Sequence, residues 1–520
     1  MTIHGKILKA HPATLVLASF LLAIVLGTLA LKLPASTRSG AISWLDALFT
    51  ATSAVCVTGL VVVDTGSYFT FFGQCVILAL IQVGGLGVMT ISVALFQWLG
   101  RSVSFRQRMI MQDLFAHTPR ADIFGLLKSI FLFTIGAEIT GALLLTIHWW
   151  QELGGANAVY MAIFHAVSAF CNAGFALFPD SLMRYSGNLL LNTTICCLIV
   201  AGGIGFPVLY DLQSWLTNRN RQRARLAIQT RTVLVTTMVL IIAGALMFAL
   251  LERQHPGATT SLAQRLLTPL FQSITCRTAG FNTVDIASLQ DATLAMMIFL
   301  MFFGASPGSC GGGVKTTTLA LLTAFTLSRI RKRRRVNIFR KSVPNETVTR
   351  SVSLILVSSG FIATVLFMLL AGDSATGHTV SCSHGTFLGY LFETVSAFGT
   401  VGLSMGVTPE LNGWGKCWII LMMIIGRVGV LTFSYIIVGT GPTNGVEYSE
   451  ENLHKVERVA SEISERTGLH VDIIAGSSPR DVWVHVPGMG YLEEAWTTLG
   501  AVQHITQGIN AMNIALLIVF

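Results

Sequence analysis

Four short glycine-containing stretches carry the residues that could do chemistry in this chain. We call them the first to fourth glycine loops, and they recur at near-even spacing along 520 residues: SAVCVTGL (53–60), SAFCNAGF (168–175), ITCRTAGF (274–281) and SAFGTVGL (396–403). One glycine after a short apolar helix usually ends that helix, but four such loops indicate an internal repeat. Since glycine adopts backbone angles that can aim carbonyl oxygens into a narrow lumen, a ring of the four loops could replace the water around a naked cation.

The composition is typical of a chain that crosses a membrane several times. Hydrophobic residues make up 52% of the sequence and charged residues only 11%, whereas soluble domains contain about 25% charged residues. The apolar run 13–31 is close to the ~20 residues that span ~30 Å of hydrocarbon. It is longer than an ordinary signal-peptide core and no small-x-small cleavage site follows it, so we interpret it as a retained first span.

The 34 Lys and Arg residues predict the orientation of the chain. They are concentrated near the amino terminus and in 99–128, 217–231 and 329–350, which the repeat pattern places on one side of the membrane. The positive-inside rule puts that side, with the amino terminus, in the cytoplasm. The basic run RIRKRRR (329–335) favours contact with membrane lipid over nucleic acid as a partner.

No residue pattern indicates an enzyme or a bound cofactor. The nine cysteines contain no C-x-x-C pair and show no metal-ligand spacing, although pairing of Cys382 with Cys417 stays open as an alternative. The segment 308–316 superficially resembles a nucleotide-binding loop, but Val314 stands where that motif needs glycine before Lys315. We therefore predict that the chain is not an enzyme and that its ligand is the transported ion alone.

The hydropathy pattern predicts three helices around each glycine loop: a long outer helix, a short pore helix and a long inner helix. A segment of ~12 residues is too short to span the bilayer, and irregular backbone at that depth is tolerated where it lines a water-filled cavity. We expect an all-α polytopic fold with four outer helix–re-entrant pore helix–inner helix repeats around one pseudo-fourfold pore. The expected outer helices are 13–33, 124–150, 230–251 and 350–371, the pore helices 43–54, 158–170, 262–275 and 385–398, and the inner helices 71–98, 188–216, 291–328 and 414–438.

These helices divide the chain into repeats and a carboxy-terminal appendage. The expected repeats are 1–105, 106–222, 223–345 and 346–445, and the appendage is 446–520. In the appendage the pattern predicts a helix that starts near Ser449 and two strands, 470–475 and 482–486. The run 468–479 weakly resembles extracytoplasmic segments of exporter permeases, so a gene fusion, a truncated read-through and a regulatory appendage all stay open.

The third inner helix is interrupted by GASPGSCGGG (304–313), which we call the break. Pro307 removes a hydrogen-bond donor, and each glycine costs about 1 kcal/mol of helix stability relative to alanine. A broken helix at membrane depth is typical of a functional site, although a surface loop between two short helices is an alternative. We interpret the break as a gate loop that lies either across the ion path or aside from it.

At this point the motifs resemble a known family, the Trk/Ktr/HKT family of potassium-uptake proteins. The resemblance rests on TSAVCVTGLVVVDTG (52–66), QVGGLGVMT (82–90), CRTAGFNT (276–283) and SPGSCGGGVKTT (306–317). It covers roughly 10–452 and is strongest to the Ktr-type membrane subunit. It implies potassium uptake, a homodimer and a cytoplasmic ring of nucleotide-binding regulatory subunits.

The resemblance assigns the glycine loops to an ion-selectivity filter. Glycine at all four equivalent positions goes with potassium preference in the family, and serine at the first would favour sodium. Because the four loops differ in sequence, the ring is only pseudo-symmetric, and a sodium-coupled or less selective monovalent cation transporter is the alternative. The expected filter residues are Val55, Cys56, Val57, Thr58, Gly59, Cys171, Asn172, Ala173, Gly174, Arg277, Thr278, Ala279, Gly280, Gly399, Thr400, Val401 and Gly402.

One acidic residue follows each glycine loop: Asp64, Asp180, Asp285 and Glu410. At the outer mouth of a pore these carboxylates would raise the local concentration of cations. Each could equally cap the next helix, and both interpretations can hold together.

Two arginines stand where a positive charge is unexpected. Arg277 lies within the third glycine loop, and we expect its side chain to bond carbonyls or an acid such as Glu393. Arg427 lies in mid-span, where charges usually face a cavity or a partner. We expect Ser306, Ser309 and the free carbonyls of the break to contact it when the break lies across the ion path. A purely structural, salt-bridged Arg427 is the alternative. The expected gate residues are Gly304, Ser306, Pro307, Gly308, Ser309, Gly311, Gly312, Gly313, Lys315 and Arg427.

Overall fold

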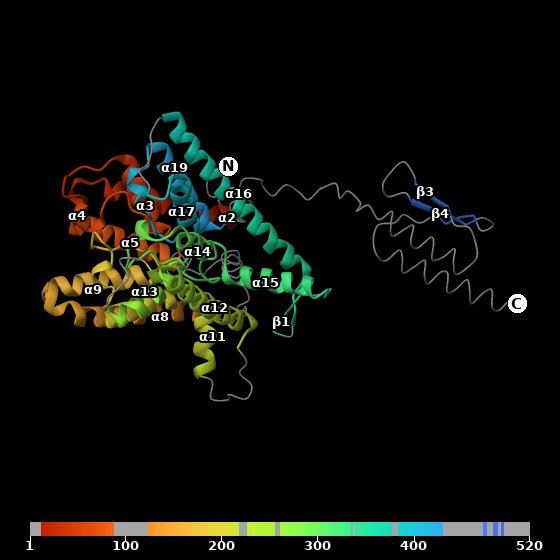
Figure 1. Ribbon diagram of the computed structural model, residues 1–520, viewed down its shortest axis with the longest axis horizontal. Coiled ribbons are helices and arrows are strands. Elements are labelled where there is room, and N and C mark those ends of the chain that lie inside the picture. The colour runs from red at the N-terminus through yellow and green to blue at the C-terminus, as the bar shows by residue number, and fades with distance from the viewer. Residues whose placement is uncertain are drawn as a thin grey trace, which may run out of the picture. The chain divides into compact units, whose positions relative to one another are not determined.

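The chain is almost entirely helical in the described residues of the computed structural model (Figure 1). The structure describes residues 12–87, 123–217, 226–254, 261–333, 336–339, 341–376, 383–429, 472–475, 482–486 and 490–492. The chain separates into two units, Met1–Val438 and Gly439–Phe520. That division falls a few residues before the repeat boundary expected at 446, which stays a prediction.

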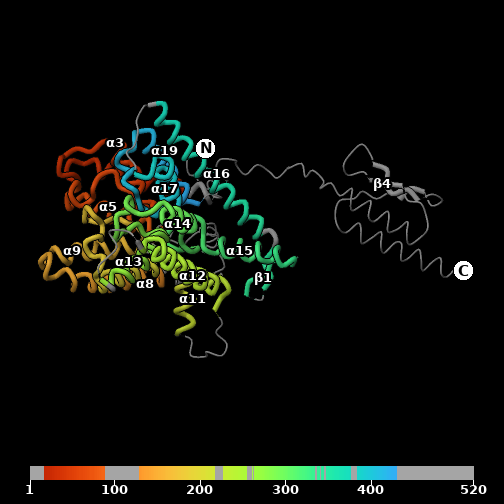
Figure 2. The backbone as a smooth tube through the Cα atoms, in the orientation of Figure 1, coloured from red at the N-terminus to blue at the C-terminus, as the bar shows by residue number. Residues whose placement is uncertain are grey.

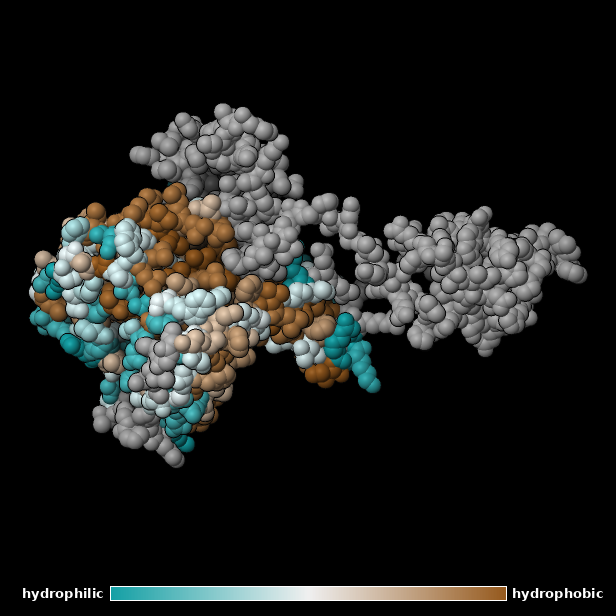
Figure 3. Space-filling view, turned by 90° about the horizontal axis from the view of Figure 1, so that it is seen from above, coloured by the Kyte–Doolittle hydropathy of each residue, from teal (hydrophilic) through white to brown (hydrophobic). Residues whose placement is uncertain are grey.

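Four long helices correspond to the expected outer helices. They are α2 (Pro12–Leu31), α8 (Ile123–Leu153), α12 (Ile228–Leu251) and α16 (Asn345–Thr376). The last three contain stretches long and apolar enough to cross a membrane: Lys128–Leu153, Ile228–Leu251 and Thr347–Ala375. Large apolar side chains such as Ile139 on α8 and Met238 on α12 are more than half exposed. The hydrophobic surface in Figure 3 is therefore suited to lipid rather than to water.

Four short helices pack against these long ones, each against the long helix that precedes it. They are α3 (Trp44–Val55), α9 (Gly155–Phe170), α13 (Leu262–Thr275) and α17 (Thr386–Gly399), and they match the expected pore helices within a few residues. Ser43 caps α3 by accepting a hydrogen bond from the Asp46 N–H at 3.0 Å, and Ser261 caps α13 by accepting from Gln264 N–H at 3.2 Å. The tube in Figure 2 follows α9 and α13 alongside their long helices.

The second expected inner helix, 188–216, is not one helix. It consists of α10 (Leu189–Ile204) and α11 (Phe206–Thr217), whose axes are bent by 99° at Gly205. The prediction of a continuous span was wrong because Gly205 has a φ of +102°, which favours glycine. A Cβ at Gly205 would lie 2.5 Å from the Pro307 carbonyl oxygen, so the bend is also a point of close backbone approach.

The other inner helices also end at or near a glycine. They are α5 (Phe71–Leu86), α14 (Asp291–Phe302) followed by α15 (Thr316–Ile330), and α19 (Gly413–Val428). Gly87 after α5 and Gly429 after α19 have φ values of +83° and +96°. The sequence suggested an interruption in the third inner helix alone. The structure shows departures from helix geometry at the ends of the other inner helices as well. The expected continuations of α5 and α19, 88–98 and 430–438, lie outside the described residues.

Short elements connect the long ones. They are α4 (Thr65–Tyr68), α18 (Val407–Glu410), the 3₁₀ turns Pro34–Ser36, Met183–Tyr185, Glu252–Gln254 and Ile286–Ser288, and the two-residue strands β1 (Asn337–Ile338) and β2 (Lys341–Ser342). The two strands pair antiparallel.

The carboxy-terminal unit contains a small antiparallel sheet in the order β3–β4–β5. Its strands are β3 (Asp472–Ala475), β4 (Val482–Val486) and β5 (Gly490–Leu492), and Ile473 pairs with Val484 in the β3–β4 ladder. The first two strands agree with the sequence analysis, whereas β5 was not expected. The helix expected from Ser449 lies outside the described residues.

Candidate functional site

The short helices end in a repeated backbone turn that builds the four glycine loops. The residue two places before each loop glycine has a positive φ: +56° at Val57, +58° at Asn172, +72° at Thr278 and +49° at Thr400. Three of these four residues are β-branched, for which the left-handed region is unfavourable. Such strain persists only where the surrounding structure imposes it, and it is concentrated at functional sites.

Hydrogen bonds at the helix ends impose this turn. In the first loop, Thr58 N–H donates to Ser53 O at 2.8 Å and Val57 N–H donates to Ala54 O at 3.1 Å, which is the Schellman pattern. The second and fourth loops repeat it, with Ala173 N–H on Ser168 O and Val401 N–H on Ser396 O. The third loop differs, because Ala279 N–H donates to Thr275 O at 3.0 Å. The asymmetry expected from sequence thus extends to the hydrogen bonds of the backbone.

The four loop glycines form a closed ring of backbone contacts. A Cβ built on Gly59 would lie 2.5 Å from Ala173 O, one on Gly174 would lie 2.9 Å from Ala279 O, and one on Gly280 would lie 2.5 Å from Val401 O. A Cβ on Gly402 would meet Thr58 O and so returns to the first loop. Each glycine therefore abuts the carbonyl that precedes the next glycine. No larger residue fits, which gives a steric reason for glycine at all four places.

The expected filter residues other than the ring glycines are buried. Loop residues Val55 to Thr58 and Cys171 to Ala173 are at most 1% exposed, as are Thr278, Ala279, Thr400 and Val401, while Arg277 is 7% exposed. Gly399 ends α17, and a Cβ there would lie 2.5 Å from Met301 O of α14. The sequence analysis predicted no hydrogen bonds that support the glycine loops. The structure shows that side-chain hydroxyls make such bonds.

Side-chain hydroxyl groups of the short helices make hydrogen bonds to the backbone of each glycine loop. Ser53 Oγ accepts from Gly59 N–H and Ser396 Oγ accepts from Gly402 N–H, both at 3.1 Å. In the second loop Ser168 Oγ donates to Phe175 O at 2.8 Å, and in the third Thr275 Oγ1 donates to Phe281 O at 2.6 Å. Sequence reasoning missed these residues, although Ser six places before the glycine in three loops was an available signal.

The break lies against the bend between α10 and α11. Cys310 N–H donates to Gly202 O and Ser306 N–H donates to Gly203 O, both at 3.1 Å. In return, Phe206 N–H donates to Gly308 O at 2.9 Å. The break is therefore joined to a neighbouring inner helix by backbone hydrogen bonds on both sides of Gly205 and is not a free surface loop.

The same segment touches the glycine loops. Gly312 N–H donates to Thr400 Oγ1 at 2.9 Å. A Cβ on Gly304 would lie 2.9 Å from Thr278 Cγ2, and a Cβ on Gly311 would meet Thr278 Oγ1. Gly313 N–H donates to Gly426 O on α19 at 3.3 Å. The break thus lies directly beside the strained residues of the third and fourth loops.

Two cationic side chains bind carbonyls at the break. Arg427, in the last turn of α19, donates from Nη1 to Cys310 O and from Nη2 to Gly84 O of α5. Lys315 Nζ donates to Gly311 O at 2.8 Å. Arg427 therefore connects the break to α5 and α19.

The expected contact of the serines of the break with Arg427 is not seen. Ser309 Oγ donates to Ser306 O at 2.7 Å, and Ser306 Oγ accepts from Thr316 Oγ1 at 3.0 Å. Both hydroxyls therefore bond within the break and the start of α15. The part of the prediction that concerned the carbonyls of the break is confirmed, because the guanidinium donates to Cys310 O as well as to Gly84 O of α5.

The expected pairing of Arg277 with Glu393 was also wrong. Arg277 Nη2 donates to Thr237 Oγ1 of α12 at 3.3 Å, so its side chain reaches the long helix behind the third loop. Glu393 accepts from Ser404 Oγ, from Met405 N–H at 3.2 Å and from Thr408 Oγ1 at 2.8 Å. The carboxylate is thus occupied by donors of its own segment, which follow the fourth loop.

The four acids after the glycine loops have local partners or lie at helix ends. Asp64 caps α4 by accepting from Ser67 N–H at 2.7 Å, and Asp285 caps the 286–288 turn by accepting from Ala287 N–H at 3.1 Å. Asp180 pairs with Arg184 at 3.1 Å, and Glu410 is the last residue of α18. The capping interpretation is therefore correct for Asp64 and Asp285, while a role at an outer mouth stays a prediction for all four.

The described residues contain no cluster of three or more His, Cys, Asp or Glu side chains that could hold a metal ion. Cys417 is free in the structure. Cys382, the other residue of the alternative Cys382–Cys417 disulfide, lies outside the described residues.

Several known proteins are similar to this chain over most of its length. It is 39% identical over 441 residues to Ktr system potassium uptake protein B from Bacillus subtilis, covering 84% of this chain and 96% of that protein. It is 39% identical to the protein of the same name from Vibrio alginolyticus, covering 86% and 95%. It is 35% identical to potassium/sodium uptake protein NtpJ from Enterococcus hirae, covering 87% and 99%.

A solved structure and a family profile agree with these relatives. The crystal structure of the potassium transporter TrkH from Vibrio parahaemolyticus matches with a TM-score of 0.63 at 19% identity, covering 84% of this chain and 86% of that one. This likeness supports the fold. The profile of the TrkH family, described as cation transport protein, matches residues 6–440. The chain is therefore a membrane protein that belongs to the TrkH family of cation transport proteins.

Proposed function

We propose that this protein takes up potassium ions across a bacterial inner membrane through the ring formed by Gly59, Gly174, Gly280 and Gly402. The observation that carries the proposal is the closed ring of contacts, in which each glycine abuts the carbonyl preceding the next. In this proposal the four segments are pore repeats around one axis, and their loop carbonyls replace the water of the ion. The names of the relatives, two of which are potassium uptake proteins, support potassium as the substrate.

The helix ends add an electrostatic contribution to this proposal. The carboxyl termini of α3, α9, α13 and α17 lead directly into the four glycine loops. Each helix carries a partial negative charge at its carboxyl end, so four such ends would favour a cation at the ring. Asp64, Asp180, Asp285 and Glu410, which follow the loops, would raise the cation concentration at the outer mouth.

The experiment that tests the filter is rubidium uptake into liposomes that contain this protein alone, with sodium or potassium as competitor. Gly59→Ser introduces a Cβ at a position with φ +90° and 2.5 Å from Ala173 O, so we expect weaker discrimination against sodium. Gly360→Ser is the matched control, because nothing lies within 4 Å of a Cβ on Gly360. An unchanged potassium preference in correctly folded Gly59→Ser protein would count against the filter.

Gating belongs to the same proposal. The break 304–313 would be the gate, held by Lys315 Nζ on Gly311 O and by Arg427 on Cys310 O. A helix that cannot continue through Pro307 and five glycines can take two positions: across the ion path or aside from it. The contacts of the break with Gly202, Gly203 and Thr400 are weak enough for a regulatory partner to shift the break from one position to the other.

We further propose that the chain works as a homodimer with a cytoplasmic ring of nucleotide-binding regulatory subunits. Support comes from the resemblance to Ktr-type subunits and from the basic segments 99–128, 217–231 and 329–350, which suit an acidic partner or anionic lipid. The amino terminus would lie in the cytoplasm. Fully regulated uptake in liposomes without a second protein would contradict the part of the proposal that concerns the ring.

A second candidate function is sodium-coupled or less selective monovalent cation transport. Two observations favour it: the third glycine loop is hydrogen-bonded differently from the other three, and one relative is a potassium/sodium uptake protein. Unequal loops make a less uniform carbonyl ring, which discriminates less between ions of different size. The same rubidium assay separates the two functions. Sodium would stimulate uptake by a sodium-coupled transporter and compete with rubidium in a less selective one, whereas a potassium-selective protein would show neither effect.

A further inference from the structure

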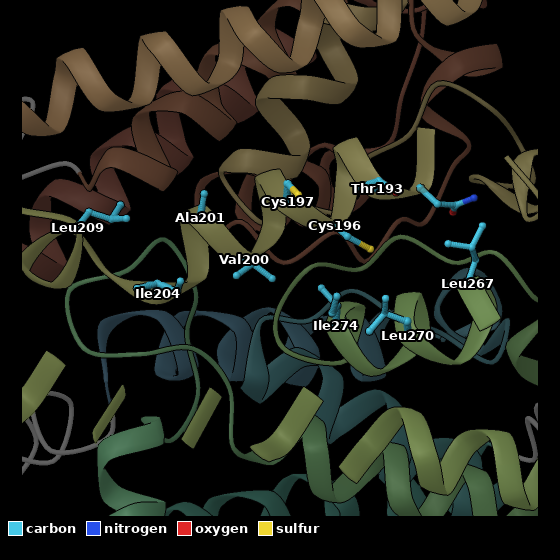
Figure 4. Close-up of a pocket in the computed structure, with 11 residues that line it drawn as sticks. Thr193, Cys196, Cys197, Val200, Ala201, Ile204, Leu209, Leu267, Leu270 and Ile274 are labelled. Atoms are coloured by element: carbon cyan, nitrogen blue, oxygen red, sulfur yellow. The ribbon is translucent and has the colours of Figure 1, made fainter. Parts of the chain in front are cut away.

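A crevice with a volume of about 410 Å³ lies between α10 and α13 and has no role in the function proposed above. One wall carries Cys196, Val200 and Ile204 of α10, and the facing wall carries Leu267, Leu270 and Ile274 of α13 (Figure 4). Leu270 is 40% exposed, so the crevice opens to the surroundings of the protein, which in a membrane are hydrocarbon.

The dimensions of the crevice decide what can occupy it. Its α10 wall runs from Asn192 to Ile204, which at 1.5 Å per residue is roughly 18 Å. That length is close to the ~15 Å of hydrocarbon in one leaflet, half of ~30 Å. A helix ~10 Å wide and equally long would fill on the order of 1,400 Å³, whereas all the empty space of the crevice, its open mouth included, is about 890 Å³. A helix of a second copy of the chain is therefore too large.

The polarity of the crevice matches an amphiphile with one apolar tail. Asn192 and Thr193 lie at the α10 end that follows the cap Asn188, whereas Val200 and Ile204 line the other end. A tail with its polar end near Asn192 would thus run along α10 towards the bend at Gly205.

We propose that the crevice binds a single acyl chain of a membrane lipid. The bound acyl chain stabilises the α10–α11 bend in its contact with the break. Ile204 precedes Gly205, whose missing Cβ admits Pro307 O, and Phe206 N–H donates to Gly308 O at 2.9 Å. On the opposite wall, Ile274 O accepts from Arg277 N–H in the third glycine loop at 3.0 Å. The coupling part of this inference rests on the proposed function, whereas the binding part does not.

Binding is tested with a phospholipid that carries a diazirine on its acyl chain, in vesicles of phosphatidylethanolamine and phosphatidylglycerol. We expect photo-crosslinks on peptides of α10 and α13. In Val200→Trp the indole fills the crevice, and crosslinking there should fall by roughly tenfold, the change that ~1.4 kcal/mol of lost binding produces. Leu189→Trp is the matched control, because Leu189 is on the same helix, is 65% exposed and lies outside the crevice.

Coupling is tested by rubidium uptake in short-chain and long-chain lipid vesicles. Uptake by wild type and by Leu189→Trp should depend on chain length, and uptake by Val200→Trp should not. Crosslinks spread evenly over the lipid-facing helices, or unchanged in Val200→Trp, overturn the binding site. A crosslink confined to the crevice with equal chain-length dependence in all three proteins overturns the coupling alone. Absence of uptake in every protein, with the crosslink intact, contradicts the proposed function and the coupling that rests on it, but not the lipid site.

Discussion

Gly312 donates its backbone N–H to Thr400 Oγ1 at 2.9 Å, a bond between residues 88 positions apart in the sequence. Thr400 is also the residue with a φ of +49° that turns the fourth glycine loop. One side chain thus holds the break and belongs to the loop that would coordinate the ion. The position of the break and the geometry of the fourth loop are therefore physically connected.

Thr400→Val should raise basal rubidium uptake while leaving the potassium preference nearly intact. Valine keeps the β-branched shape and removes the acceptor for Gly312 N–H. A lost hydrogen bond of about 0.5–1.5 kcal/mol corresponds to a shift of about 2- to 10-fold in the position of the break. Thr400→Ser retains the hydroxyl and serves as the control. Equal basal uptake in Thr400→Val and wild type would show that this bond does not hold a gate.

Arg427→Ala should raise basal uptake more strongly than Thr400→Val. The guanidinium bridges Cys310 O and Gly84 O, and hydrogen bonds from a charged donor contribute about 1.5–3 kcal/mol each. Deletion of 308–312 should have the same effect. In both variants the selectivity should change little, because the glycine ring is untouched.

Arg427→Lys separates the two ways in which Arg427 could restrict flux. Lysine keeps the positive charge but cannot present the planar guanidinium fork that reaches two carbonyls. If bridging is what matters, basal uptake rises in Arg427→Lys as well. Wild-type uptake in Arg427→Lys would assign the effect to charge repulsion alone and would contradict the bridging role.

Ser53→Ala should weaken the discrimination between potassium and sodium in competition assays. The hydroxyl accepts from Gly59 N–H at 3.1 Å, and its loss leaves that buried N–H unsatisfied and the glycine free to rotate. Removal of one partner of a buried hydrogen bond costs about 1–3 kcal/mol, so we expect a change of several-fold or more. Thr52→Val is the control on the same helix, because among the described residues the bond that Thr52 Oγ1 makes is to Leu48 O, within α3. An equal loss of selectivity in both variants would indicate a general loosening of α3.

Truncation after Asn452 should leave folding and uptake intact. Residues Gly439–Phe520 form a separate unit, and all four glycine loops and the break lie before it. The measurements are size-exclusion chromatography and rubidium uptake of the truncated protein. Aggregation, or loss of uptake with normal expression, would show that residues 453–520 stabilise the part of the chain that carries the glycine loops.

Local features of the sequence were sufficient to predict the four short helices and the glycine loops that follow them. Each glycine loop follows an apolar helix of its own, and the turn at Val57 or Thr400 forms from hydrogen bonds within a few residues. The break at Pro307 was also visible, because proline and consecutive glycines oppose a helix whatever surrounds them. The bend at Gly205 had the same local signal in GGIGFP (202–207), but the apolar residues on both sides of it made a continuous span the simpler prediction.

Contacts across the ring were decided by the tertiary structure alone. Arg277 bonds Thr237 and not Glu393 because α12 packs behind the third loop, while Glu393 is satisfied by Thr408 and its neighbours. The sequence likewise determined that four glycines recur, but not that Gly402 closes the ring on Thr58 O. Such pairings depend on how segments far apart in the chain pack, and each polar group bonds the donor or acceptor that this packing brings within reach.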